Sequence, residues 1–180
     1  MTPLFTWKKR VRFYDIQSQL ALPYAPTPEV VIQDAFSSLE MGFGLSRGSN
    51  QTFIDLGAGT GQIVMYCART YKIASYGIEI NDGFVRIARK AIRREKLRNA
   101  TVFQGDLFTH DIGQYDFVFI YTLPPVQKFL NHVFETAHRG AIIFTYKYPL
   151  DELSHLLALR YEAQVDVDGS PVRIYFYERK

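Results

Sequence analysis

Apolar residues along this chain fall into two alternating patterns. Short apolar runs rich in β-branched and aromatic residues predict buried strands at 52–56, 73–80, 101–103, 115–121 and 141–146. The segments between them repeat their apolar residues every three or four positions, which predicts helices over about 28–42, 61–71, 82–97, 126–137 and 150–159. This alternation predicts an α/β, Rossmann-like fold with a mostly parallel sheet, helices on both faces and a ligand at the carboxyl ends of the strands.

The two ends of the chain complete this prediction. Residues 163–167 and 172–178 alternate apolar and polar side chains around Asp168-Gly169, which predicts an antiparallel β-hairpin at the edge of the sheet. Residues 1–22 have no sustained period and are interpreted as an N-terminal arm, while residues 23–180 are expected to form one domain. At the start of that domain, Thr27 is expected to be the N-cap of a helix whose first residue is Pro28.

The central predicted strand ends in an acid and three glycines at alternate positions. The sequence Asp55-Leu56-Gly57-Ala58-Gly59-Thr60-Gly61 predicts a tight turn into a helix, where main-chain N–H groups are open to a ligand. A dinucleotide-binding loop needs a glycine three residues after the second one, and Gln62 stands there. A P-loop needs a lysine and a hydroxyl after its last glycine, and neither is present. The spacing instead resembles motif I of the seven-strand S-adenosylmethionine (SAM)-dependent methyltransferases.

Acidic residues follow two further predicted strands. Glu79 lies eighteen residues after Gly61, the spacing at which an acid meets ribose hydroxyls in nucleotide-binding α/β folds. Asp106 is placed to accept a hydrogen bond from an adenine amine, and Leu107 or Phe108 can lie against the ring. Because parallel strands end at one edge of a sheet, the polar side chains at these ends are expected to line one rim: Asp55, Glu79, Asp106 and Tyr121.

Three further stretches carry a narrower resemblance. They are Pro23–Pro28 ahead of the first core helix, Gly77–Asn81 with Ala88-Arg89 beyond it, and Tyr121–Pro125 after the fourth strand. These stretches resemble the small protein lysine methyltransferases of archaea and their mitochondrial relatives, and the likeness runs from about residue 24 to the end. In that family SAM lies over the glycine loop, the Pro-Tyr-x-Pro-Thr-Pro segment covers it, and the loop after the fourth strand faces the lysine.

The resemblance implies a SAM-dependent protein-lysine N-methyltransferase with a defined set of site residues. The implied cofactor-binding residues are Tyr24, Pro26, Thr27, Asp55, Gly57, Gly59, Gly61, Glu79, Asn81, Asp106, Leu107 and Tyr121. The implied substrate-binding residues are Tyr24, Leu123, Pro124 and Pro125. Catalysis is expected to be mainly positioning by Tyr121, Leu123 and Pro124, because carbonyls of their loop would hold the amine in line with the transferred methyl group. No general base stands out.

Two other kinds of function stay open. A nucleic-acid or small-molecule N-methyltransferase would share this core and use the basic residues of 86–98 to bind phosphates. Amino-methylating enzymes of DNA, RNA and glutamine carry Asp/Asn-Pro-Pro and an aromatic residue, where this chain has Leu123-Pro124-Pro125-Val126. Leu123 cannot accept a hydrogen bond from a planar NH₂ group, which favours a flexible alkyl amine. The other alternative is a non-catalytic module that retains only the fold.

Composition and charge limit the remaining classes. The net charge of +3 is uneven, because Arg86 to Arg98 holds seven basic residues against Glu95, as is typical of a solvated helix face. The single cysteine, Cys67, excludes an intramolecular disulfide, and the spacing of the four histidines predicts no metal site. No stretch reaches the roughly twenty apolar residues of a membrane span. No apolar segment follows the basic N-terminus, so secretion is not indicated and a cytoplasmic location is expected.

Overall fold

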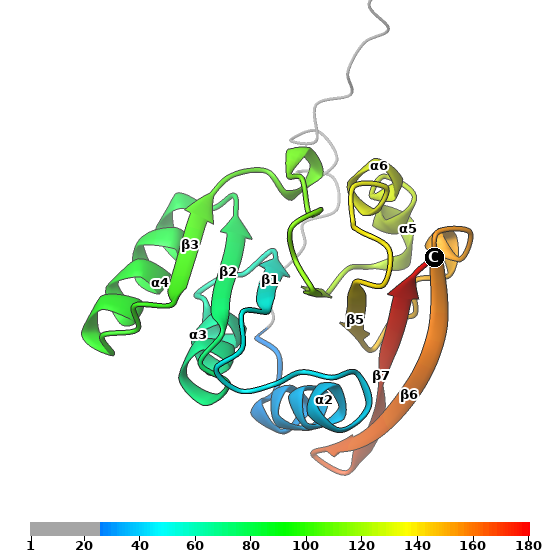
Figure 1. Ribbon diagram of the computed structural model, residues 1–180, viewed down its shortest axis with the longest axis horizontal. Coiled ribbons are helices and arrows are strands. Elements are labelled where there is room, and N and C mark those ends of the chain that lie inside the picture. The colour runs from blue at the N-terminus through cyan, green and yellow to red at the C-terminus, as the bar shows by residue number, and fades with distance from the viewer. Residues whose placement is uncertain (1–25) are drawn as a thin grey trace, which may run out of the picture.

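Strand β1 (Thr52–Leu56) lies in the middle of the sheet in the computed structural model, which describes residues 26–180. In these residues the sheet has seven strands in the order β3-β2-β1-β4-β5-β7-β6 (Figure 1). Strands β2 (Ala74–Glu79), β3 (Ala100–Gln104), β4 (Phe117–Ile120) and β5 (Ile142–Tyr146) run parallel to β1. Successive strands are added on one side of β1 and then on the other, so a topological switch point lies between β1 and β4.

The C-terminal hairpin closes the sheet in the antiparallel direction. Strands β6 (Leu157–Val167) and β7 (Ser170–Arg179) pair with each other, and β7 pairs with β5. The connecting Asp168 and Gly169 have φ of 53° and 80°, as a two-residue hairpin turn with two left-handed residues requires. The predicted fold class is therefore confirmed, including the antiparallel hairpin.

The helix predicted over residues 150–159 is wrong. Only a 3₁₀ helix, η2 (Asp151–Leu153), forms there, and β6 begins already at Leu157. Leu157 pairs with Arg179 at the far end of β7, so the long β7 gives this segment backbone partners that a helix would forgo. Pairing with a distant strand therefore outweighs the local helical period.

Three helices cover one face of the sheet: α2 (Glu29–Gly42), α3 (Gln62–Thr70) and α4 (Asp82–Arg94). Cys67 of α3 is completely buried in this layer, which confirms its expected place in the core. The predicted basic residues of α4 are exposed, but Ile87, predicted to face inward, is 52% exposed, and Val85 is buried instead. Val30 of α2, also predicted inward, is 44% exposed.

The start of α2 differs from the prediction. Its N-cap is Pro28, whose carbonyl accepts hydrogen bonds from the Val31 and Ile32 N–H groups, and no side chain caps the helix. Thr27 therefore lies one position too early to be the cap. Its side chain is left available for a different role, because it lies ahead of the helix at the edge of a cavity.

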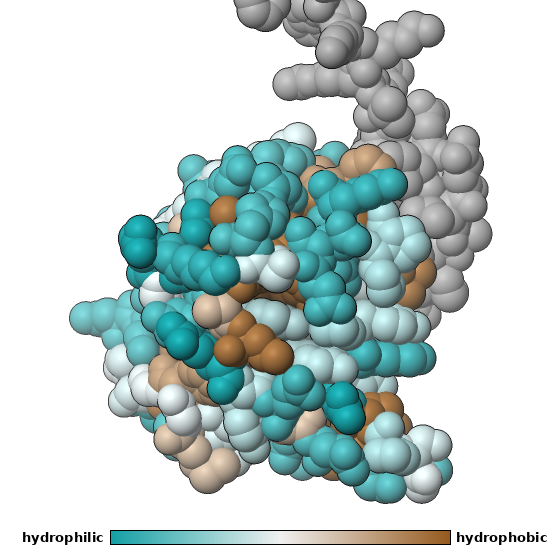
Figure 2. All heavy atoms as spheres, turned by 90° about the vertical axis from the view of Figure 1, so that its right-hand side faces the viewer, coloured by the Kyte–Doolittle hydropathy of each residue, from teal (hydrophilic) through white to brown (hydrophobic). Residues whose placement is uncertain are grey.

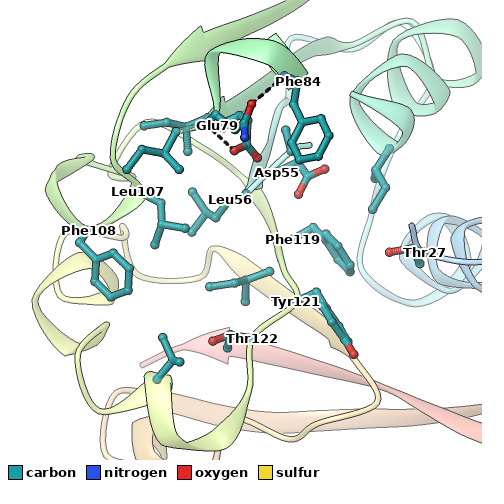
Figure 3. A pocket seen from close by; sticks show the side chains of 18 of the residues that line it. Thr27, Asp55, Leu56, Glu79, Phe84, Leu107, Phe108, Phe119, Tyr121 and Thr122 are labelled. Atoms are coloured by element: carbon teal, nitrogen blue, oxygen red, sulfur yellow. Dashed lines mark hydrogen bonds between the residues drawn. The ribbon is translucent and has the colours of Figure 1, made fainter. Parts of the chain in front are cut away.

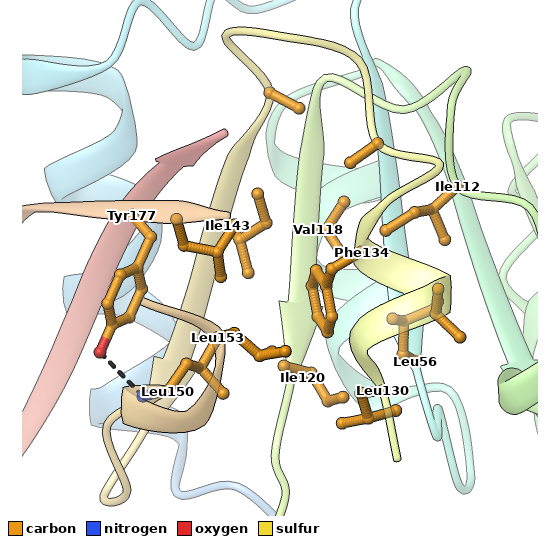
Figure 4. Close-up of a cluster of buried hydrophobic side chains, with 14 of the residues drawn as sticks. Leu56, Ile112, Val118, Ile120, Leu130, Phe134, Ile143, Leu150, Leu153 and Tyr177 are labelled. Carbon is orange, nitrogen blue, oxygen red and sulfur yellow. Dashed lines mark hydrogen bonds between the residues drawn. The ribbon is translucent and has the colours of Figure 1, made fainter. Parts of the chain in front are cut away.

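Short helices cover the other face: η1 (Leu107–Thr109), α5 (Pro124–Gln127), α6 (Asn131–Phe134) and η2. They pack on apolar side chains of β1, β4 and β5, and the Tyr177 hydroxyl accepts a 2.9 Å hydrogen bond from the Leu150 N–H group (Figure 4). The single helix predicted over 126–137 is thus divided in two. Its backbone bonds around Phe129 and Leu130 run from residue i to i+3, so 3₁₀ turns replace the α-helix there.

The outer face over the β6–β7 hairpin is mainly hydrophilic, with scattered apolar side chains (Figure 2). Within residues 26–180, no helix has both the length and the apolar character needed to cross a membrane. The same residues contain no group of three or more His, Cys, Asp or Glu side chains placed to bind a metal ion. Predictions for the arm of residues 1–22 and for Tyr24 lie outside the described residues, and the boundary between arm and domain stays a prediction.

Candidate functional site

A cavity of about 760 Å³ lies at the carboxyl ends of β1 and β4, at the switch point of the sheet (Figure 3). Its walls come from the ends of β1, β2 and β4, from the loops that follow β3 and β5, and from the residues ahead of α2. The structure brings together ten residues that the sequence singled out: Pro26, Thr27, Asp55, Gly57, Glu79, Asn81, Asp106, Leu107, Tyr121 and Leu123. The rule that ligands bind at a switch point therefore locates this cavity correctly.

Four predicted residues do not line the cavity. Gly61 is the left-handed N-cap of α3, and a Cβ atom there would lie 3.0 Å from the Ala88 Cβ, so this glycine permits close packing of α3 on α4. Gly59 contributes its backbone to the loop without facing the cavity. Pro124 and Pro125 are exposed at the start of α5, beside the cavity rather than in its wall.

Glu79 ties the glycine loop to the end of β2. One carboxylate oxygen accepts a 2.8 Å hydrogen bond from the Gly59 N–H group, and the other accepts a 2.8 Å bond from the Asn81 N–H group. The Gly57 and Ala58 N–H groups donate to the Ile78 carbonyl at 2.9 and 3.0 Å. Each carboxylate oxygen has more than one acceptor site, so Glu79 can hold the loop and still accept hydroxyl groups of a ligand.

Asp55 is the electrostatic exception in the cavity. Its side chain is only 4% exposed and lines the cavity, and no donor of residues 26–180 forms a hydrogen bond with its carboxylate. Burial first, and then the negative charge of Glu79, raises the pKa of Asp55 to about 8. A buried carboxylate without a donor favours a ligand that brings positive charge or hydrogen-bond donors.

The side of the cavity formed after β3 combines one acid with an apolar surface. Asp106 caps η1 with one oxygen, which accepts a 2.9 Å bond from the Phe108 N–H group, and its other oxygen stays available. Leu107 and Phe108 lie beside it in the cavity wall (Figure 3). Asn81 acts first as the N-cap of α4, because its Oδ1 accepts a bond from the Phe84 N–H group at 3.2 Å. A flat ring with an amine at its edge fits this surface.

The opposite end of the cavity is aromatic and apolar. Tyr121 and Leu123 line it as predicted, together with Tyr148, which sequence reasoning missed. Tyr148 follows β5 by two residues, so the same strand-end rule that located Asp55 and Tyr121 would have found it. Burial, with a smaller contribution from Tyr148, raises the pKa of Tyr121, which stays a neutral phenol.

The cavity therefore fits a nucleoside that carries a positive charge. Acceptors for hydroxyl groups and for a ring amine are provided by Glu79 and Asp106, and an unpartnered buried carboxylate by Asp55. The open glycine loop, with Gly57 at a φ of 92°, exposes backbone to the same space. The aromatic end is the space left for a second molecule.

Comparison with known proteins gives three findings. The family model described as the ANTKMT methyltransferase domain matches residues 55–156, more than half of this chain. A lysine N-methyltransferase of Caenorhabditis elegans, whose name refers to ATP synthase, is 24% identical over 135 residues, 74% of this chain and 70% of that protein. A Methanocaldococcus jannaschii protein, named provisionally as a protein N5-glutamine methyltransferase, is 27% identical over 111 residues, 56% of this chain and 55% of that protein.

Solved structures give the same fold. An RNA methyltransferase from Salinibacter ruber, solved in complex with S-adenosyl-L-homocysteine, superposes with a TM-score of 0.70 and 29% identity. The superposition covers 86% of this chain and 94% of that one.

Proposed function

This chain belongs to the family of the ANTKMT methyltransferase domain, and on that premise we propose that it transfers methyl groups from SAM to lysine side chains of proteins. The observation that carries the proposal is the division of one cavity into two ends of different chemistry. The carboxylates of Asp55, Glu79 and Asp106 come from the ends of β1, β2 and β3, whereas Tyr121, Leu123 and Tyr148 come from the ends of β4 and β5.

The first end holds the cofactor in this proposal. When bound, SAM supplies an electrophilic methyl group on a sulfonium centre. Glu79 accepts hydrogen bonds from its ribose, Asp106 accepts one from its adenine amine, and Asp55 faces its positive charge. Thr27 and Asn81 complete the wall around it.

The second end positions the acceptor. Leu123 gives its wall no side-chain acceptor, so a planar amide or base would lose the hydrogen bond that holds its NH₂ group. A lysine amine needs no such partner and can use the carbonyls of the loop at 121–124. Positioning of this kind lowers the barrier by removing the entropy cost of alignment.

The proposal is tested by incubating the protein with methyl-labelled SAM and cell extract. We expect label in protein, released as methylated lysine after acid hydrolysis. Label found only in RNA, in methylglutamine or in a small metabolite would overturn the lysine assignment. Failure to bind SAM in a calorimeter would favour a non-catalytic module instead.

An RNA substrate is the second candidate, because the S. ruber structure is that of an RNA methyltransferase. Exposed Arg89, Lys90 and Arg93 on α4 would then bind phosphates, and turnover should fall steeply with salt. The lysine proposal expects that replacing these three residues with Gln leaves turnover nearly unchanged.

We predict that Glu79→Ala weakens SAM binding by roughly 1.5–3 kcal/mol. The variant loses the acceptors for the ribose and also the bonds to the Gly59 and Asn81 N–H groups that shape the loop. Calorimetric titration measures the effect, and thermal unfolding checks that the fold is kept. Glu152→Ala is the control, because Glu152 is exposed on η2 outside the cavity. Equal SAM affinity of Glu79→Ala and the control would show that the ribose site is misplaced.

Activity on protein lysine is predicted to rise with pH from 7 toward about 9–10, because free lysine has a pKa of about 10.4 and attacks only when neutral. The aromatic end of the cavity contains no carboxylate or histidine that would take the proton. Rates are to be measured with SAM saturating and over times in which the protein remains folded. A bell-shaped profile with its maximum near pH 7 would indicate a dedicated base. A cytoplasmic location stays a prediction.

A further inference from the structure

We infer that Tyr148, with Tyr121, forms an aromatic wall that binds the ammonium group of the acceptor, so that the site selects lysine and its methylated forms over planar amines. This inference rests on the proposed transfer to lysine and adds the residue that determines acceptor specificity. The elements that carry it are the ring positions, the turn that holds Tyr148, and a lysine of the chain itself that already contacts the ring.

Three tyrosines cluster at the ends of β4 and β5. The Tyr121 ring centroid lies 5.9 Å from that of Tyr148 and 5.6 Å from that of Tyr146. Tyr121 and Tyr148 both line the cavity, and Tyr146 packs behind them against the buried layer under α2. Two adjacent aromatic rings at the wall of one cavity are the arrangement that binds alkyl ammonium groups in proteins.

A tight turn holds Tyr148 in this position. The Tyr148 N–H group donates to the Tyr146 carbonyl at 2.9 Å, and the residue between them, Lys147, has a φ of 71°. This is a γ-turn with positive φ, a rare and strained conformation for a residue other than glycine. The Lys147 N–H group donates to the Arg173 carbonyl on β7 at 2.8 Å, which fixes the turn to the sheet.

A buried side chain fixes the other end of the turn. Gln127, only 1% exposed, donates a 2.7 Å hydrogen bond to the Pro149 carbonyl. Gln127 belongs to α5, which begins directly after Leu123. The segment that carries Tyr148 is therefore joined to the segment that carries Leu123, and the two walls of the acceptor end keep a fixed separation.

The chain itself provides an example of the proposed contact. The Lys147 ammonium nitrogen lies 5.4 Å from the centroid of the Tyr148 ring, although Lys147 does not line the cavity. The ring thus already attracts one lysine ammonium outside the cavity. None of the carboxylates that line the cavity comes from the β4 or β5 end, so an acceptor cation would be held there by aromatic rings rather than by an ion pair.

The chemistry of such a wall favours methylated amines. Each N-methyl group makes the cation less strongly hydrated and keeps its charge, so mono- and dimethyl-lysine bind to rings at least as well as lysine does. In each transfer the amine nitrogen gains one methyl carbon, its proton goes to solvent, and the C–S electron pair stays on sulfur. A wall that retains methylated lysine therefore promotes successive transfers to the same nitrogen.

The first test measures binding alone, with the full-length protein saturated with S-adenosyl-L-homocysteine. The probes are N-acetyl-trimethyl-lysine methyl ester and its neutral isostere with a tert-butyl group, each titrated by NMR. We expect the cation to bind more tightly than the isostere, Tyr148→Leu to weaken cation binding about tenfold, and Tyr148→Phe to preserve it. Tyr161→Leu on the exposed part of β6 is the matched control. Equal binding of the two probes, or no effect of Tyr148→Leu, overturns the inference.

The second test follows the products on a lysine-rich peptide by mass spectrometry. Tyr148→Leu is expected to shift the products from di- and trimethyl-lysine toward monomethyl-lysine, and Tyr148→Phe to restore the wild-type pattern. Thermal unfolding and S-adenosyl-L-homocysteine binding establish that both variants are folded. No methylated lysine with the wild-type protein, on peptide or extract, would refute the proposed function. Active wild type with an unchanged product pattern in Tyr148→Leu would refute only the role of Tyr148.

Discussion

Asp55→Asn is expected to stabilise the protein without ligand at pH 9 and to weaken its binding of SAM. The folded protein holds the Asp55 proton up to a pKa of about 8, whereas the ordinary pKa of the group is 3.8. Between these values the unfolded chain has lost the proton and the folded chain retains it, so the free energy of unfolding falls as pH rises. Above pH 8 the folded protein contains a buried charge without a donor, at its full cost.

The Asn variant removes this charge while keeping the size of the side chain. We expect a gain of about 2–4 kcal/mol in unfolding free energy at pH 9, and little difference near pH 4, where the carboxyl is neutral in both states. Glu79 favours the same result, because its negative charge also raises the pKa of Asp55. The weaker SAM binding follows because a neutral amide no longer attracts the positive charge of the ligand.

Urea unfolding at pH 5, 7 and 9 measures the stability, and calorimetry at pH 9 measures the SAM affinity. Glu152→Gln, an exposed acid-to-amide change on η2, is the control and should leave both quantities unchanged. If Asp55→Asn destabilises the unliganded protein at pH 9, Asp55 has a donor and its charge belongs to the fold. If the variant is more stable and binds SAM normally, the carboxylate does not face the cofactor.

Gly77→Ala is expected to destabilise the protein by roughly 3 kcal/mol, at the upper end of the usual cost of overpacking. A Cβ atom at Gly77 would lie 2.6 Å from the Ala58 Cβ and 2.9 Å from a Val64 methyl group, distances that real contacts do not show. Both neighbours are short side chains close to the backbone, so β2 must move away from the glycine loop and α3. Movement of Ala58 would also displace the loop from Glu79, so SAM binding should weaken.

Urea unfolding at neutral pH compares this variant with Gly42→Ala. Gly42 is the last residue of α2, and a Cβ atom there meets nothing within 4 Å. The control is therefore expected to be neutral or stabilising by up to about 1 kcal/mol, since alanine favours a helix over glycine. A Gly77→Ala variant as stable as wild type would mean that the glycine loop can shift without cost.

The sequence alone determined the parts of this protein that depend on local chemistry and on strand order. The apolar runs around 52–56, 73–80, 101–103, 115–121 and 141–146 are strands, because burial on both faces of a parallel sheet requires continuous apolar character. Asp168-Gly169 specified the hairpin, because both residues tolerate the left-handed conformation that its turn requires. Alternate glycines and strand-end acids located the cavity, because parallel strands bring their carboxyl ends to one edge.

The tertiary structure decided everything that depends on a partner distant in sequence. Residues 157–159 extend as β6 because β7 offers them backbone hydrogen bonds, which no local period records. Glu79 is occupied by the Gly59 and Asn81 N–H groups because folding places the glycine loop over the end of β2. Asp55 holds its proton because strands, helices and Glu79 surround it, and Tyr148 reaches the cavity because β7 and Gln127 hold its turn. Burial and long-range contact set these properties, and both exist only in the folded chain.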